Sequence, residues 1–243
     1  MQLYLAHLEL HGLLVLAEEV RSIKVSLLAG GPLIRSSKFI HNYTLMYALS
    51  PIPEAPYGGY LGFTDKPSYK LIDDLKKEKL LYAYPAQPLD IRLVRVFTAS
   101  KPETLCEVRG RPKIGHPFQV HYIAVAPGSK YKTIILCDEN IHLPRYVRLG
   151  KKRWGIVKLT YHPLMSMERV KPRYSTVPVN IGDMREFGVK IENYITVATT
   201  RNHTHIGEKA SIGYVKANPT YKLVFRINGK TETVYTPIPE HFL

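Results

Sequence analysis

Cysteine is nearly absent from this chain of 243 residues, because only Cys106 and Cys137 occur and they form no CxxC pair. The sequence therefore predicts neither a structural zinc site nor a disulfide framework, and a reducing compartment is expected. No run of 18 apolar residues could cross a bilayer, and residues 1–9 lack the basic start and long apolar segment of a signal peptide. We expect a cytoplasmic protein without a membrane partner.

Motifs for cofactors and catalysis are also missing. The glycines of the loop around Gly58 belong neither to a Walker loop nor to a GxGxxG that opens a helix. His203 and His205 could be two metal ligands on one strand face, yet no nearby carboxylate or cysteine completes a site. His116 and His121 lie on or beside predicted strands and are interpreted as structural. We expect no cofactor, no metal and no catalytic residues.

Positive charge is plentiful and unevenly placed. The formal net charge is +14 and the pI is about 9.6, which indicates a polyanionic partner. Residues 1–90 hold equal numbers of acidic and basic side chains, whereas residues 91–175 hold 17 basic against 5 acidic ones. Solubility alone would not require this concentration in the middle third, but a binding groove would.

The densest basic stretch is Leu143–Trp154, which holds five cations in the nine residues 145–153 and has Tyr146 and Trp154 near its two ends. Alternation in Tyr146–Leu149 predicts a half-buried strand with Val147 and Leu149 on one face. Two interpretations stay open at this point: a passive solvated surface, or a nucleic-acid contact in which an aromatic ring stacks on a base.

Apolar periodicity predicts a mixed α+β chain. We expect helices over 38–49, capped by Ser36 or Ser37, and over 68–80, the second with a solvated charged face. Strands are expected over residues 2–10, 91–97, 118–125, 133–137, 155–161, 194–200 and 212–216. Asn228-Gly229 predicts a tight hairpin between residues 222–227 and 230–236. With no repeat or linker, residues 1–243 are interpreted as a single domain.

Two of these stretches resemble a known family. Phe39–Leu49, FIHNYTLMYAL, resembles the helix "LHNYALxYALG", and Leu143–Lys151, LPRYVRLGK, resembles the segment "LPxWIRLGK", of the Cas-five-type subunit of type I-D CRISPR effector complexes. The chain departs from that pattern at Ser50-Pro51, at Tyr146 in place of the usual Trp, and over most of the region after Leu164.

The resemblance implies a member of the repeat-associated (RAMP) superfamily. Its expected fold is a ferredoxin-like, RRM-related antiparallel sheet with helices on one face, a β-hairpin thumb placed here around residues 101–117, and an extra β-rich C-terminal part. Its expected role is non-catalytic: it caps the 5′ handle of the crRNA and joins backbone Cas-seven-type subunits to a Cas-ten-type large subunit. The assembly recognises target double-stranded DNA near the PAM.

Charge and resemblance together select thirteen candidate RNA-binding residues. They comprise the basic and aromatic residues of the dense stretch, the cations of the thumb loop and three residues near the first helix: Arg145, Tyr146, Arg148, Lys151, Lys152, Arg153, Trp154, Arg109, Arg111, Lys113, Lys38, His41 and Asn42. As the single tryptophan, Trp154 is expected to be at least half buried.

Two other functions stay open. Relatives in type I-C systems cut their precursor RNA with Tyr, Lys and His side chains, so a metal-independent endoribonuclease is one alternative. A general RNA-binding module outside CRISPR is the other.

Overall fold

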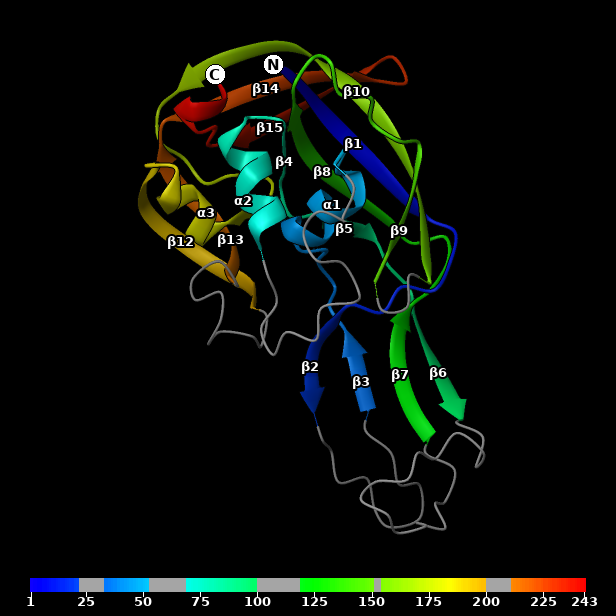
Figure 1. Ribbon diagram of the computed structural model, residues 1–243. Helices are drawn as coiled ribbons and strands as arrows, with labels where there is room; N and C mark the ends of the chain where they lie inside the picture. The colour runs from blue at the N-terminus through cyan, green and yellow to red at the C-terminus, as the bar shows by residue number, and fades with distance from the viewer. Residues whose placement is uncertain (22–32, 53–68, 100–118, 151–153, 200–210) are drawn as a thin grey trace.

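The computed structural model describes residues 1–21, 33–52, 69–99, 119–150, 154–199 and 211–243 (Figure 1). The described elements are, in chain order, β1 (Gln2–Leu10), β2 (Ala17–Arg21), β3 (Leu33–Ser36), α1 (Asn42–Leu49), α2 (Lys70–Lys77), β4 (Leu81–Ala83), β5 (Gln87–Asp90), β6 (Leu93–Ala99), β7 (Gln119–Val125), β8 (Lys130–Cys137), β9 (Tyr146–Leu149), β10 (Gly155–Val170), β11 (Val179–Asn180), α3 (Ile181–Glu186), β12 (Lys190–Thr199), β13 (Ser211–Asn218), β14 (Thr220–Ile227), β15 (Lys230–Thr236) and the 3-10 turn η5 (Glu240–Phe242).

The largest sheet has the strand order β15-β14-β10-β1-β8-β4, with β9 paired to β10 and β5 to β8. All of these pairs are antiparallel. The first half of β10 pairs with β1 and β9, and its second half pairs with β14. One long strand therefore links the N-terminal part of the sheet to the C-terminal hairpin.

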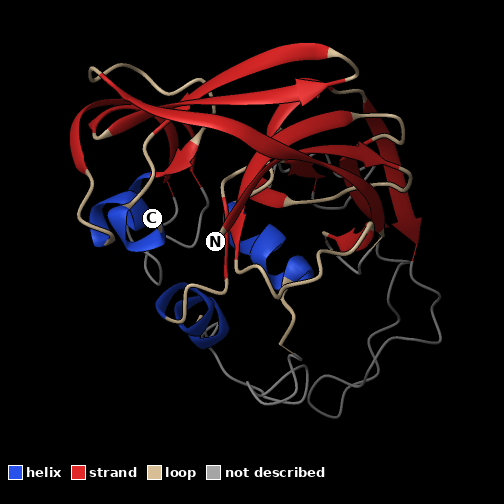
Figure 2. Ribbon diagram, turned by 90° about the horizontal axis from the view of Figure 1, so that it is seen from above, coloured by secondary structure: helices blue, strands red, loops and turns tan. Residues whose placement is uncertain are grey.

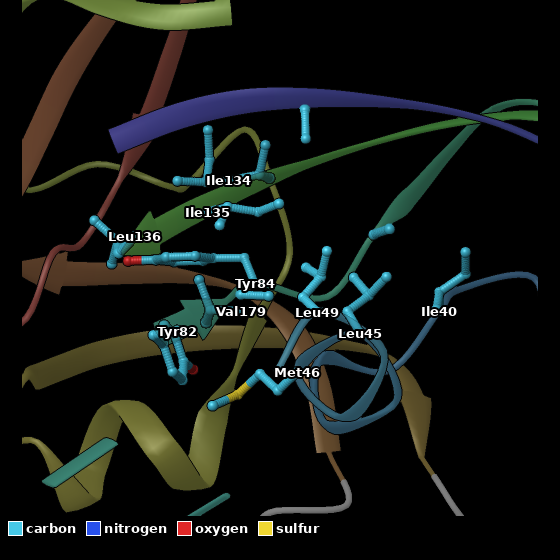
Figure 3. Packing of buried hydrophobic residues seen from close by; sticks show 14 of the residues in the cluster. Ile40, Leu45, Met46, Leu49, Tyr82, Tyr84, Ile134, Ile135, Leu136 and Val179 are labelled. Carbon is cyan, nitrogen blue, oxygen red and sulfur yellow. The ribbon is translucent and has the colours of Figure 1, made fainter. Parts of the chain in front are cut away.

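Helices cover one face of this sheet, here called the inner face (Figure 2). Leu45, Met46 and Leu49 of α1 belong to the same apolar cluster as Tyr82 of β4 and Ile135 of β8 (Figure 3). All five are buried, and each such side chain contributes about 1.5–3 kcal/mol through its removal from water. The helices are therefore held mainly by their apolar sides.

The opposite, outer face is only partly covered. Leu5 and Ile134 are fully buried there although they are paired neighbours on β1 and β8 that point away from the helices. The β14–β15 hairpin crosses above this part, since Glu232 of β15 meets Lys132 of β8 at 2.9 Å. The part of the outer face nearest β9 stays open to solvent.

Two smaller sheets complete the described structure. One has the order β11-β13-β12, and the other has the order β2-β3-β7-β6 and extends from the body at the bottom of Figure 1. Strands β6 and β7 form an antiparallel pair that brackets the expected thumb loop. The loop itself, residues 101–117, lies outside the described residues.

Most of the predicted strands are confirmed, and so is the C-terminal hairpin. Asn228 and Gly229 have φ angles of 48° and 79°, as a type I′ turn requires. Strand β10 continues to Val170, well beyond the predicted end at residue 161. Both helices are shorter than expected.

The first helix begins at Asn42, not at Lys38. Ile40 instead forms a bridge with Ala86, with N–H···O distances of 3.1 and 2.8 Å in the two directions. The cap is also not a serine: the Nδ1 atom of His41 accepts the Tyr43 N–H at 3.2 Å. The bridge at Ile40 and the cap at His41 therefore delay the start of the helix.

The prediction of a solvated charged face on the second helix is wrong at Lys76. Its side chain is 3% exposed, and its ammonium lies 3.2 Å from Asp183 and 3.1 Å from Glu186. Both partners belong to α3, a six-residue helix that the sequence did not predict. Strands β2 and β3 were not predicted either.

Candidate nucleic-acid interface

The candidate interface is the uncovered part of the outer face, where β9 pairs with β10. Val147 and Leu149 are buried against the helices, so Tyr146 and Arg148 point outward, as the alternation predicted. Tyr146 is 56% exposed. The strand thus presents one aromatic ring and one guanidinium to solvent.

Cross-strand pairing places further polar groups in rows beside these two. Arg148 lies opposite Ile156, and Tyr146 lies opposite Lys158. The same row continues through Glu9 on β1 to Lys130 on β8, and the next row contains Thr160. We call the outward residues of these rows the outer strip: Tyr146, Arg148, Ile156, Lys158, Thr160, Glu9 and Lys130. Four strands contribute to it, which fixes its spacing.

The cations of the outer strip have no ion-pair partner among the described residues. Glu9 is the one carboxylate of the strip, and it lies 3.9 Å from the Nε2 atom of His11. The His11 ring in turn meets Tyr146 edge-on, with 6.3 Å between ring centroids. Arg148, Lys158 and Lys130 therefore offer positive charge to an external group, because three cations of the strip outnumber its single carboxylate and none of them forms an ion pair with a described residue.

A glycine ends the strand that carries Arg148. Gly150 has a φ of +77°, and a β-carbon there would lie 2.8 Å from both the Cδ1 atom of Leu14 and the carbonyl oxygen of Val15. No other residue fits this turn without displacing the backbone of Val15. The turn leads into Lys151, Lys152 and Arg153, which lie outside the described residues.

The other predicted residues of the dense stretch lie at the edges of the strip. Arg145 is exposed at the start of β9. The preceding loop is held in place because the Tyr161 hydroxyl donates to the Pro144 carbonyl at 2.6 Å. Trp154 is partly buried beside Tyr122, with ring centroids 6.0 Å apart, so the expected burial is confirmed. Tyr146 is the more accessible of the two rings for stacking.

The residues near the first helix do not join the strip. Lys38 is exposed in the segment before α1, and His41 caps the helix. Asn42 is fully buried, with its amide donating to Asp183 at 2.7 Å, so its position does not support the expected RNA contact. Other candidates lie outside the described residues: Arg109, Arg111, Lys113, His116, His203 and His205.

A buried polar cluster surrounds Asp183, a residue that the sequence did not single out. Its carboxylate accepts hydrogen bonds from Asn42, from the hydroxyls of Tyr43 and Tyr82 at 2.7 and 3.1 Å, and from Lys76. Its backbone N–H donates to the side chain of Asn180, the cap of α3. This carboxylate therefore joins α1, α2, α3 and β4 from inside the protein.

Burial and charge shift the pKa values in this cluster. Burial alone would lower the pKa of Lys76, but the carboxylates of Asp183 and Glu186 and their hydrogen bonds outweigh it and raise that pKa. Burial, then the negative charge of Asp183, raises the pKa of Tyr82. Neutral tyrosine hydroxyls therefore surround the buried ion pair of Lys76 and Asp183, which is a structural arrangement.

Other kinds of site find little support in the described ranges. They contain no group of three metal-ligating side chains. Cys137 is buried, and burial raises the pKa of its thiol to about 11, so it is not a reactive nucleophile. No helix among the described residues is long and apolar enough to span a bilayer.

Comparisons with known proteins identify the family. The model of the type I-D CRISPR-associated protein Cas5/Csc1 family matches residues 1–221, and no curated protein matches the chain. A solved structure described as a CRISPR protein from Archaeoglobus fulgidus is 10% identical over 98% of this chain and 100% of its own, with a TM-score of 0.34, a similarity too low to support an argument. The match over residues 1–221 includes both motifs, the outer strip and Asp183, and the chain belongs to the type I-D CRISPR-associated Cas5/Csc1 family.

Proposed function

We propose that this protein is a non-catalytic subunit of a type I-D CRISPR effector complex that binds the 5′ handle of the crRNA on the outer strip. The observation that carries the proposal is the set of outward cations beside the exposed ring of Tyr146: Lys158 and Lys130 lie in the same row as this ring, and Arg148 lies in the adjacent row. Cations that lack internal partners bind backbone phosphates, and an exposed ring next to them can stack on a base.

Strand spacing supports a single-stranded ligand. Neighbouring strands lie about 4.8 Å apart and successive outward residues about 7 Å apart, so the cations form a two-dimensional array instead of a single point. An extended RNA can cross such an array with several phosphates in contact. A small anion would need only one of these cations.

The finer expectations from the family form part of the same proposal. The central sheet with helices on its inner face is the counterpart of a ferredoxin-like, RRM-related core, and the β6–β7 pair is the base of the thumb. The proposed partners are backbone Cas-seven-type subunits, a Cas-ten-type large subunit and target double-stranded DNA near the PAM. The proposed location is the cytoplasm.

Salt dependence of RNA binding tests the role of the outer strip. Arg148→Ala combined with Lys158→Ala should weaken binding of a single-stranded repeat RNA. It should also reduce the slope of log K against log salt concentration by roughly 0.7 for each lost phosphate contact. Fluorescence anisotropy between about 50 and 300 mM salt, a range over which the Debye length falls by more than half, measures both.

A matched control is Lys190→Ala, which removes an exposed cation from β12 in a different sheet. It should leave the slope unchanged. If the double variant binds with the same slope as the unmodified protein, the outer strip is not the RNA surface. Co-purification of guide RNA and partner subunits with the tagged protein tests membership of the complex, and cleavage of the repeat RNA without metal would contradict the non-catalytic role.

A further inference from the structure

A second group of titratable side chains lies at the end of the outer strip. The rings of His7 on β1 and His162 on β10 meet edge-on, with 5.1 Å between their centroids. Lys132 on β8 lies 2.9 Å from Glu232 on β15, and the Nε2 atom of His7 lies 4.0 Å from the same carboxylate. Four strands from distant parts of the chain therefore place one imidazole and one ammonium beside a single acid, with a second imidazole against the first.

The group continues the rows of the outer strip. His7 pairs with Thr160 on one side and Lys132 on the other, one row beyond Lys158, Glu9 and Lys130. It lies on the same face of the sheet, about 7 Å farther along the strands. A strand of RNA that follows the rows from Arg148 would reach it before the β14–β15 hairpin closes the face.

A purely structural role explains Lys132 and Glu232 but not the two histidines. The Lys132–Glu232 pair fastens β15 across β8, and it would do so with any neutral neighbours. The two imidazoles add nothing to that contact when they are neutral. The His7 side chain and that of Glu232 are both 30% exposed, so the group remains open to a ligand from solvent.

The surroundings of His7 favour its neutral form. Burial lowers its pKa most, His162 and Lys132 lower it further, and Glu232 opposes them. The same face carries Lys130 and, opposite it on β5, Asp90, while Lys230 lies two residues from Glu232 on β15. An arriving anion would reverse the balance, because a negative charge beside an imidazole stabilises its protonated form.

We propose that His7, His162 and Lys132 form a second phosphate subsite for the RNA backbone, which takes up protons as the RNA binds. This inference rests on the RNA-binding function proposed above and extends it to the end of the strip nearest the hairpin. Lys132 can hold Glu232 and a phosphate together, since an ammonium has three donors. Each imidazole, once protonated, adds one donor and one positive charge.

The pH dependence of RNA binding at constant ionic strength tests the subsite. Affinity for a single-stranded RNA oligonucleotide should rise about tenfold between about pH 8 and pH 5.5 if binding raises one imidazole pKa by one unit. His7→Gln combined with His162→Gln should abolish this rise and leave the affinity at the higher pH nearly unchanged. His142→Gln, which alters an exposed histidine of the loop before β9, should retain the rise.

The result separates the two proposals. Arg148→Ala with Lys158→Ala should weaken binding by a similar factor at every pH and keep the rise. If the unmodified protein binds RNA with an affinity that the histidine variants do not alter at any pH, the subsite is wrong and the function of the outer strip stands. If the unmodified protein binds no RNA, both fail.

Two further measurements test whether the histidines bind RNA or cut it. Gel analysis of the probe detects cleavage, and loss of cleavage in the double variant would overturn a binding-only subsite. Nuclear magnetic resonance of the imidazole C–H signals in the unmodified protein needs no substitution. Addition of RNA should raise the pKa of His7, and an unchanged value would overturn the proposal even if the variant fails to fold.

Discussion

The buried cluster around Asp183 and the exposed outer strip both contain charged and tyrosine side chains, yet their charges are arranged in opposite ways. Asp183 is fully buried and accepts four side-chain hydrogen bonds, whereas the cations of the strip face solvent without an ion-pair partner among the described residues. The first arrangement satisfies every charge within the chain. The second leaves charge for an external partner.

The difference separates residues that hold the fold from residues that can bind. A buried charge without its partner is very unfavourable, so removal of either member of an internal pair destabilises the protein. An exposed cation is solvated in either state and contributes little to stability. Substitutions in the buried cluster should therefore lower the free energy of unfolding, whereas substitutions in the outer strip should lower the affinity for RNA.

The largest effect is expected at the centre of the buried cluster. Asp183→Asn should destabilise the protein by about 3–5 kcal/mol, because an amide has one acceptor oxygen for four buried donors, and Lys76 keeps only its pairs with the partly exposed Glu186 and Asp73. Urea unfolding monitored by circular dichroism measures the loss. Glu186→Gln is the control, since its side chain is 43% exposed and its loss should cost about 1 kcal/mol or less. Equal losses of unfolding free energy in the two variants would mean that burial of a carboxylate does not determine how much it contributes to stability.

A smaller effect is expected at the turn after β9. Gly150→Ala should destabilise by about 1–2 kcal/mol for its left-handed backbone and by about a further 1 kcal/mol or more for contact with Leu14 and Val15. Gly128→Ala provides the match, because Gly128 has a φ of +82° but open space around it. The difference between the thermal unfolding midpoints of the two variants measures the contact with Leu14 and Val15. Identical midpoints would show that Val15 moves to accommodate the added methyl group.

The smallest effect on stability is expected in the outer strip. Arg148→Ala and Lys158→Ala should each change the free energy of unfolding by less than about 0.5 kcal/mol. The same chemical denaturation measures them. A loss several times larger would reveal an internal partner and remove the contrast between the two regions.

Local patterns predicted the elements whose signal lies within a few residues. The alternation from Tyr146 to Leu149 has a period of two, and Asn228-Gly229 has the backbone freedom that its turn needs. The outward position of Arg148 followed from the first pattern alone. These parts of the fold depend on residues that are close in the sequence, so local sequence patterns predict them.

The parts that were missed depend on contacts between distant residues. The burial of Lys76 is set by Asp183, 107 residues away, and no local feature of α2 reveals it. Helix α3 has only six residues, too few for a clear apolar period. Strand β10 continues past Pro163 because a register shift between Leu164 and Ser166 bends it from β1 toward β14. Lys130 and Lys132 entered the site through cross-strand pairing, which a single sequence does not show.

The length of β10 has a consequence for how the two ends of the chain communicate. Its sixteen residues carry Lys158 and Thr160 at one end and the ladder to β14 at the other. Any force on the C-terminal hairpin, such as the docking of a neighbouring subunit, would pull on the same hydrogen-bonded backbone that spaces the cations. If the outer strip binds RNA as proposed, RNA binding and subunit contact would then be coupled through one strand.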